Sequence, residues 1–267
     1  GRTLKDLIMS DPLALLGRSV PEGRFPLLLK LIDARERLSV QVHPDDATAA
    51  RWGGEPKTEA WYVLEASPGA TLYAGLRPGT DRAAVEEAIR TGQIEGLLNV
   101  VPVRTGDTLF IPAGRVHALG AGILLLEVQQ NSNTTYRLYD WGRVGHDGRP
   151  RETHVAQALR AIRWQDSGSP ICTPVPLQGP NGWSGSRLVE CPYFQMERWK
   201  LSSPAQEPLE DVRSARVLFV ECGAILLTGE FGSLEASAGM SVLCPAALRD
   251  LQIQPQPTAT LVRIIVV

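Results

Sequence analysis

A strand, an abrupt corner and a second strand follow one another between residues 106 and 130, and this stretch limits the fold more than any other. Gly106 begins a turn, the run TLFI is apolar, and Pro112 and Gly114 end the strand before His117, in the pattern G-x5-P-x-G-x2-H. Because proline fixes φ and glycine permits left-handed backbone, the pair predicts a tight corner. Such a corner directs one imidazole from the end of a strand into the interior of a β-barrel.

Short apolar runs bounded by turn residues continue along the chain, which has 25 glycines and 20 prolines among its 267 residues. This pattern is typical of a strand-rich sandwich or barrel and not of a helical bundle. Helices are predicted only locally: after Thr3, after Asp11-Pro12, and over residues 81–90, where apolar side chains fall on one face. The predicted fold class is therefore mainly β with a few short helices.

A segment rich in Ser, Pro and Gly, near residues 165–186, divides the chain. We therefore predict an N-terminal domain over residues 1–165, with short helical insertions, and a C-terminal β-sandwich over residues 166–267. No histidine follows His154, so metal ligands are expected only in the first domain. His146 and His154 themselves lie in a polar loop and are expected at the surface.

Charge and cysteine content exclude several classes of protein. The net charge of −2 and the pI of about 6.1 argue against a nucleic-acid or membrane-surface partner. No apolar run reaches the roughly 18 residues of a membrane helix. The four cysteines include no C-x2-C pair, which disfavours zinc-finger and redox motifs and predicts four free, buried thiols. These features indicate a cytoplasmic protein.

Two histidines, one glutamate and one glutamine form a candidate metal site. Gln41 and His43 are two residues apart on a predicted strand and so share a face. Glu59 begins another predicted strand, and His117 follows the corner. Two imidazoles, one carboxylate and one amide oxygen hold a divalent ion and leave positions open for a substrate, as catalytic zinc and non-haem iron sites do.

The segments that carry these residues resemble type I mannose-6-phosphate isomerases, most closely the short bacterial form. They are LSVQVHPDD (38–46), KTEAWY (57–62), PAGRVHA (112–118) and the run from 129 to 141, in that order. The corner pattern is also the second signature of the cupin superfamily. The resemblance is continuous over about residues 3–165 and looser beyond. It implies a double cupin, that is, two jelly-roll barrels, with one Zn²⁺ bound by Gln41, His43, Glu59 and His117.

The resemblance also implies an activity, the interconversion of mannose 6-phosphate and fructose 6-phosphate through an enediol. The partner is then a small sugar phosphate, and the enzyme a monomer or a homodimer. The family places Arg137 and Lys57 in the active site. Arg137 is always charged and can stabilise an enediolate or anchor the substrate, while Lys57, on the strand face of Glu59, is expected to transfer a proton. No P-loop motif is present, so Asn131 and Ser132 are the predicted substrate-binding donors.

Two features depart from the family pattern. The N-terminal strands of the family, with their Trp-Gly-Gly segment, have no counterpart before Gly1. Either the sequence is truncated, or the first barrel exposes a sheet edge that must be covered. In addition, Asn133 occupies a position where the family commonly has Asp. Since an amide cannot act as a general base, reduced activity is expected if that carboxylate takes part in the reaction.

Two alternative functions stay open. An iron-dependent cupin dioxygenase would use the two histidines and the glutamate, although a fourth ligand such as Gln41 weighs against it. A non-catalytic sugar-phosphate-binding cupin is favoured by Asn133 and by the missing strands, because a fold does not by itself establish an activity.

Overall fold

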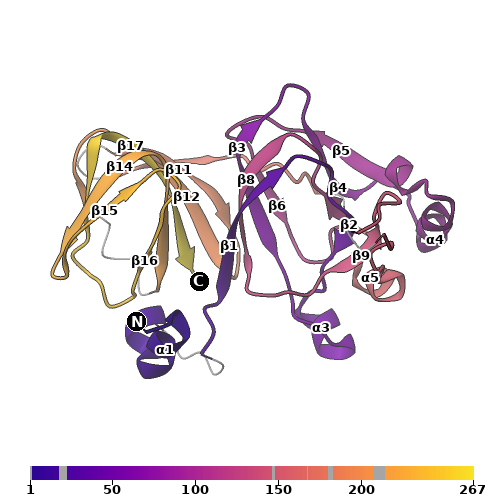
Figure 1. Ribbon diagram of the computed structural model, residues 1–267, viewed down its shortest axis with the longest axis horizontal. Coiled ribbons are helices and arrows are strands. Elements are labelled where there is room, and N and C mark those ends of the chain that lie inside the picture. Colours follow the sequence, from indigo (N-terminus) through magenta and orange to yellow (C-terminus); the bar gives the residue numbers. More distant parts are fainter. Residues whose placement is uncertain (1, 18–22, 146–147, 167, 180–182, 207–213) are drawn as a thin grey trace. The chain divides into compact units, whose positions relative to one another are not determined.

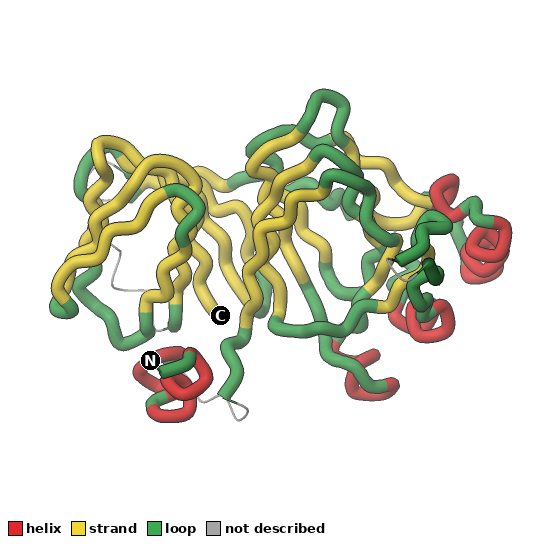
Figure 2. Tube along the Cα trace, in the orientation of Figure 1, coloured by secondary structure: helices red, strands yellow, loops and turns green. Residues whose placement is uncertain are grey.

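The computed structural model describes residues 2–17, 23–145, 148–166, 168–179, 183–206 and 214–267 (Figure 1). Strands make up the larger part of the regular secondary structure and the helices are short (Figure 2), which confirms the predicted fold class. The chain divides into two compact units. Residues 27–172 form one unit, and residues 1–26 form the other together with residues 173–267.

The N-terminal helices therefore pack with the C-terminal strands and not, as predicted, with the rest of residues 1–165. These helices are α1 (Leu4–Ser10) and α2 (Pro12–Leu16), and they start at Thr3 and Asp11, the predicted caps. The backbone N–H groups of Ala246 and Ala247 donate to the carbonyls of Leu15 and Ala14. Because this pairing joins opposite ends of the chain, local sequence patterns could not reveal it.

Two antiparallel sheets form the unit of residues 27–172. One has the strand order β1-β8-β3-β6 and the other β5-β4-β7-β2-β9. A buried cluster takes Trp61 and Leu125 from the first sheet and Leu72 and Val101 from the second, so the sheets pack face to face. The strands are β1 (Leu27–Ala34), β2 (Val40–Val42), β3 (Glu59–Ala66), β4 (Thr71–Leu76), β5 (Leu98–Pro102), β6 (Thr108–Ile111), β7 (His117–Ala118), β8 (Ile123–Gln130) and β9 (Tyr136–Tyr139).

Helices cover the outer face of the five-stranded sheet. The unit contains α3 (Asp46–Trp52), α4 (Arg82–Thr91), the 3₁₀ helix η1 (Ile94–Leu97) and α5 (Val155–Ala161). Val85 of α4 and Ala158 of α5 share a buried cluster with Val40 and Val42 of β2. Since successive strand residues point to opposite faces, Gln41 between these valines faces the other sheet.

One eight-stranded sheet forms most of the other unit, in the order β10-β11-β12-β17-β14-β15, with β13 beside β17 and β16 beside β14. The long strand β14 is continuous, with register shifts near Val220 and Gly223. Such irregularities bend a strand, and side chains from several strands meet in one core. The strands are β10 (Val175–Gln178), β11 (Ser184–Glu190), β12 (Phe194–Leu201), β13 (Ala205–Gln206), β14 (Arg216–Gly229), β15 (Gly232–Ser237), β16 (Ser241–Cys244) and β17 (Gln252–Val266).

The cysteines are all free, as predicted, but they are not all buried. Cys191 and Cys244 lie in the interior, Cys172 is half-buried, and Cys222 is exposed, which corrects the expectation of four buried thiols. Among the helices that the structure describes, none has the length and apolar character needed to span a membrane.

Candidate metal centre

The corner before β7 ties His117 to the backbone of His43. Gly114 has a φ of +90°, in the left-handed region, and its N–H donates to the carbonyl of His43 over 2.9 Å. A Cβ atom at Gly114 would also lie 3.0 Å from Cβ of Arg163, so a side chain would be crowded there. The glycine that sequence analysis assigned to a corner thus sets the relative positions of the two histidines.

Three neighbouring strands place polar side chains in one row. Gln41 of β2 lies opposite His117 of β7 and, on its other side, opposite Arg137 of β9. Residues directly opposite each other in antiparallel strands share a sheet face. Gln41 faces the inside of the barrel, so His117 and Arg137 belong to that inner face as well.

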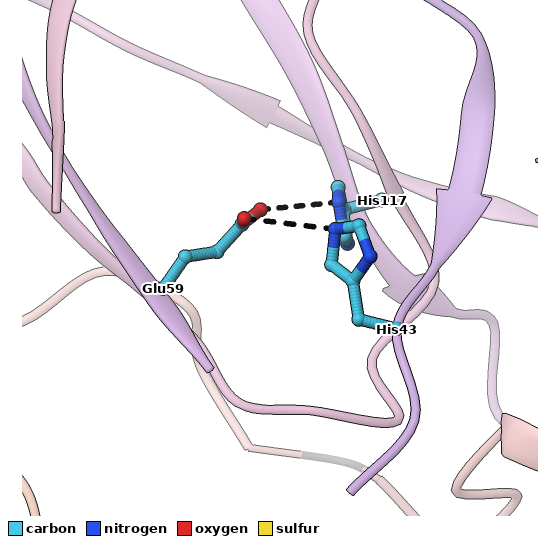
Figure 3. Close-up of side chains that lie close together, drawn as sticks. All are labelled: His43, Glu59 and His117. Atoms are coloured by element: carbon cyan, nitrogen blue, oxygen red, sulfur yellow. Dashed lines mark ion pairs between the residues drawn. The ribbon is translucent and has the colours of Figure 1, made fainter. Parts of the chain in front are cut away.

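Glu59 reaches the same point from the other sheet, at the start of β3 (Figure 3). Its Oε1 lies 3.2 Å from His117 Nε2, and its Oε2 lies 3.6 Å from His43 Nε2. One ligand atom of each of these three residues lies within 4.8 Å of the others. All three side chains are buried, so the predicted convergence of two imidazoles and one carboxylate is present.

Backbone carbonyls orient both imidazole rings. His43 Nδ1 lies 2.9 Å from the carbonyl of Thr134, and His117 Nδ1 lies 2.9 Å from the carbonyl of Arg115. A carbonyl only accepts, so both Nδ1 atoms carry hydrogen, and the Nε2 atom of each ring faces Glu59. Metal-binding histidines are commonly held in this way. Burial lowers the pKa of His43 to about 4, which keeps the ring neutral and able to bind a cation at neutral pH.

The carboxylate of Glu59 is suited to a cation. Both of its oxygens are buried, and among the described residues neither has a partner with hydrogen-bond geometry. Burial by itself would raise the pKa of Glu59, but the positive charge of Lys57 and then the two histidines hold it well below its usual range. A buried, ionised carboxylate with incompletely satisfied oxygens fits a metal ion. The donor set, two nitrogens and one oxygen, fits the same conclusion.

Gln41 and Lys57 complete the cluster. Gln41 Nε2 lies 3.2 Å from His117 Nε2, and rotation of the amide by half a turn would present its oxygen there instead. Lys57 Nζ lies 3.0 Å from Glu59 Oε2 and 3.2 Å from His43 Nε2. The side chain of Lys57 is only 6% exposed, so its ammonium is held at the cluster away from bulk water.

Arg137 lies in the same row but is engaged elsewhere. Its Nη1 donates to the carbonyl of Glu152 over 2.6 Å, and its backbone N–H lies 3.3 Å from Nδ1 of His154. Burial lowers the pKa of Arg137, and the neighbouring Arg151 adds to this effect. His154, predicted at the surface, is half-buried beside Arg137; His146 lies outside the described residues.

The segment of residues 131–134 supports His43 instead of lining the cluster directly. Ser132 is buried; its hydroxyl donates to the carbonyl of Glu55 over 3.1 Å and accepts from the N–H of Thr134. The N–H of Glu55 donates in turn to Thr134 Oγ1. Asn131 is half-buried, whereas Asn133 is exposed and donates its backbone N–H to Glu55 Oε2 over 3.3 Å. The departure from the family therefore falls on an exposed side chain.

Sequence reasoning missed a second polar group on the inner face of the four-stranded sheet. Lys30 Nζ lies 2.7 Å from Glu127 Oε2 and 2.5 Å from Gln129 Oε1. Trp61 Nε1 donates to Glu127 Oε1, and the Trp61 ring meets His117 edge-on at 5.4 Å. The sequence contains a signal for this polar group. Glu127 and Gln129 are two residues apart in the run ILLLEVQQ, so their side chains share one face of the strand. Trp61 thus connects this polar group to His117.

The family model described as the catalytic domain of type I phosphomannose isomerase matches residues 1–66. Over 257 residues the chain is 34% identical to the probable mannose-6-phosphate isomerase GmuF of Bacillus subtilis, covering 95% of this chain and 79% of that protein. Over 198 residues it is 39% identical to the mannose-6-phosphate isomerase of Streptococcus mutans. That match covers 74% of this chain but spans only 61% of the Streptococcus mutans protein.

Solved structures have the same fold. The crystal structure of the mannose 6-phosphate isomerase from Bacillus subtilis superposes with a TM-score of 0.87 and 32% identity, covering 99% of this chain and 82% of that one. A mannose 6-phosphate isomerase bound with zinc and yttrium superposes with a TM-score of 0.74, covering 99% of this chain and 86% of that one. Its 18% identity supports likeness of fold alone.

Proposed function

Because the chain belongs to the type I mannose-6-phosphate isomerase family, we propose that it interconverts mannose 6-phosphate and fructose 6-phosphate in a metal-dependent reaction. The single observation that supports this most directly is the convergence of His43, Glu59 and His117 inside the barrel, with their ligand atoms within 4.8 Å. A related protein carries the name of this activity, and the cluster provides the chemistry that moving a proton next to a carbonyl requires.

We assign the metal position to these three residues, with the amide oxygen of Gln41 as the fourth ligand and Zn²⁺ as the ion. A crystal structure of an isomerase with this fold contains zinc, and two imidazoles, a carboxylate and an amide suit that ion. When bound, the ion would supply Lewis acidity toward the sugar oxygens. A neutral His43 and an ionised Glu59 are the protonation states that metal binding requires.

We assign proton transfer between C1 and C2 of the sugar to Lys57. Its Nζ is within 3.2 Å of both Glu59 and His43, at the edge of the cluster. An ammonium or amine held there can donate or accept a proton at a carbon whose oxygen points into the cluster. Its near-complete burial limits exchange of that proton with bulk water.

We assign substrate anchoring to Arg137, which shares the inner face with Gln41. A guanidinium there can stabilise the negative charge of an enediolate or of a phosphate. Asn131 and Ser132 remain our proposed phosphate contacts, and the buried hydroxyl of Ser132 would have to exchange its bond to the carbonyl of Glu55 for one to the substrate.

Metal analysis combined with a coupled assay tests the proposal. The purified chain should contain about one zinc and convert mannose 6-phosphate to fructose 6-phosphate, and chelation followed by zinc should remove and restore turnover. Iron together with oxygen consumption would establish a dioxygenase instead. Saturable binding of mannose 6-phosphate without turnover would establish a non-catalytic binding protein.

A further inference from the structure

A row of three charged side chains crosses the inner face of the C-terminal sheet. Glu197 of β12 lies opposite Arg187 of β11 on one side and opposite Arg263 of β17 on the other. Residues opposed in this way share a face. Glu197 and Arg263 are only 6% and 4% exposed, and Arg187 is half-buried. Glu197 thus lies between two arginines on this face: Arg263 contacts it, whereas Arg187 pairs with Glu190 over 2.9 Å.

Glu197 is fully engaged by protein donors. Its Oε1 accepts from Gln195 Nε2 over 2.6 Å, and its Oε2 accepts from Trp199 Nε1 over 2.9 Å and from Arg263 Nη1 over 3.0 Å. The guanidinium of Arg263 also lies 5.1 Å from the centre of the Trp199 ring. With both oxygens occupied, Glu197 acts as a fixed counter-ion that holds Arg263 and Gln195 in place.

The row lines a cavity of about 560 Å³. Arg187, Glu197 and Arg263 contribute to its wall together with Gln178, Gln195 and Trp199. Known small-molecule sites measure roughly 300–1,000 Å³. All of these wall residues belong to the unit of residues 173–267, whereas the metal cluster belongs to the other unit.

Stability alone does not account for such a row. Replacing a buried ion pair by apolar side chains of similar volume is often neutral or stabilising. The adjoining core of Trp199, Leu218, Val220 and Leu261 is apolar, so apolar residues would be compatible with this interior. Charged groups that border a cavity and are held in place by neighbours are typical of a ligand site.

We propose that this cavity is a second ligand site, which binds a small hydroxyl-rich metabolite carrying an oxyanion. The wall contains two guanidiniums, of which Arg263 pairs with Glu197 and the half-buried Arg187 pairs with Glu190 over 2.9 Å. An oxyanion would take the place of Glu190 at Arg187. Arginine recognises phosphate and carboxylate groups through paired N–H donors. Gln178 and Gln195 supply amide groups for hydroxyls. Sugar phosphates and sugar acids share this chemistry.

A matched series of open-chain polyols tests the site. Sorbitol 6-phosphate, gluconate and sorbitol have the same six-carbon skeleton with a phosphate, a carboxylate or no charge, and none has a carbonyl to isomerise. Calorimetric titration of the zinc-loaded full chain should show saturable binding of at least one anion and at least tenfold weaker binding of sorbitol. Failure of both anions to bind would overturn the proposal, whereas binding of one or both that persists in the His117→Ala variant identifies the preferred group.

Variants separate this site from the metal centre. Arg187→Gln should weaken anion binding at least tenfold and leave isomerase turnover within twofold of the parent value. The control Arg198→Gln changes the residue next to Glu197; Arg198 lies on the opposite face of the sheet and pairs with Glu221, so this variant should leave binding within twofold. His117→Ala, with its fold checked by circular dichroism, should retain binding. Unchanged affinity in Arg187→Gln, or loss of binding in His117→Ala, would contradict the assignment.

Discussion

Lys57 Nζ lies 3.0 Å from Glu59 Oε2, across a spacing of two residues at the start of β3. The same ammonium lies 3.2 Å from His43 Nε2. The start of β3 therefore contributes both a candidate metal ligand, Glu59, and a candidate proton carrier, Lys57. Substitutions of the two residues should differ in their effects on metal content and turnover.

Lys57→Met should lower turnover by about 10²–10⁴-fold, the usual contribution of a general acid or base. The metal content should stay near that of the parent, because methionine keeps a similar volume and removes no proposed ligand. Zinc analysis and the coupled assay on one preparation check both points. Lys200→Met, at an exposed lysine of β12, is the control. A variant that loses its zinc would show that Lys57 belongs to the metal binding itself.

His117→Ala should lose metal and activity together. Changes to residues that merely orient a ligand typically cost 10–100-fold in metal affinity, so removing a ligand should cost more than about 100-fold. Competition with a zinc chelator measures the affinity. His154→Ala is the matched control, since His154 is a half-buried histidine outside the cluster. Full zinc affinity in His117→Ala would exclude this residue as a ligand.

Ser132→Ala should reduce metal affinity, although Ser132 is not a proposed metal ligand. The hydroxyl joins the N–H of Thr134 to the carbonyl of Glu55, and the carbonyl of Thr134 orients His43. Leaving these buried groups unpaired should destabilise the fold by about 1–3 kcal/mol. Zinc affinity should fall by about 10–100-fold. Asn133→Ala, one residue away and exposed, should change neither quantity appreciably; equal effects of the two variants would refute the role of Ser132.

Asp140→Asn should destabilise the protein at neutral pH but not in acid. Burial would raise the pKa of Asp140, but hydrogen bonds from Arg151 and Arg143 lower it overall. A lowered pKa in the folded state means that the carboxylate stabilises the fold above its unfolded pKa of about 3.9. This stabilisation disappears as the pH falls through the lower folded value.

Denaturant unfolding at several pH values measures this difference. The parent should exceed Asp140→Asn by about 1.5–3 kcal/mol at pH 7, the range for hydrogen bonds to charged groups. The two curves should approach each other as the pH falls below about 4. A difference that stays constant from neutral to acid pH would mean that the charge of Asp140 does not contribute.

Local sequence patterns predicted several helix starts and the corner before His117. Asp81 caps α4, and Thr3 and Asp11 cap α1 and α2, because capping depends on a few neighbouring residues. Because side chains alternate along β2, Gln41 points to the other face of the sheet from the buried Val40 and Val42. Gly114 formed the expected corner. Where long-range pairing decided the result, prediction was incomplete: α1 and α2 pack with the C-terminal strands and not with the rest of residues 1–165.

The sequence by itself determined which residue types were available for the metal centre and which corner would present His117, because strand alternation and glycine geometry are local properties. Only the tertiary structure decided that Glu59 meets both histidines from the opposite sheet, and that Thr134 orients His43. It also decided that residues 1–26 join the C-terminal strands and that Arg187, Glu197 and Arg263 form one row. These contacts depend on strand register and sheet packing, which join residues far apart in the chain.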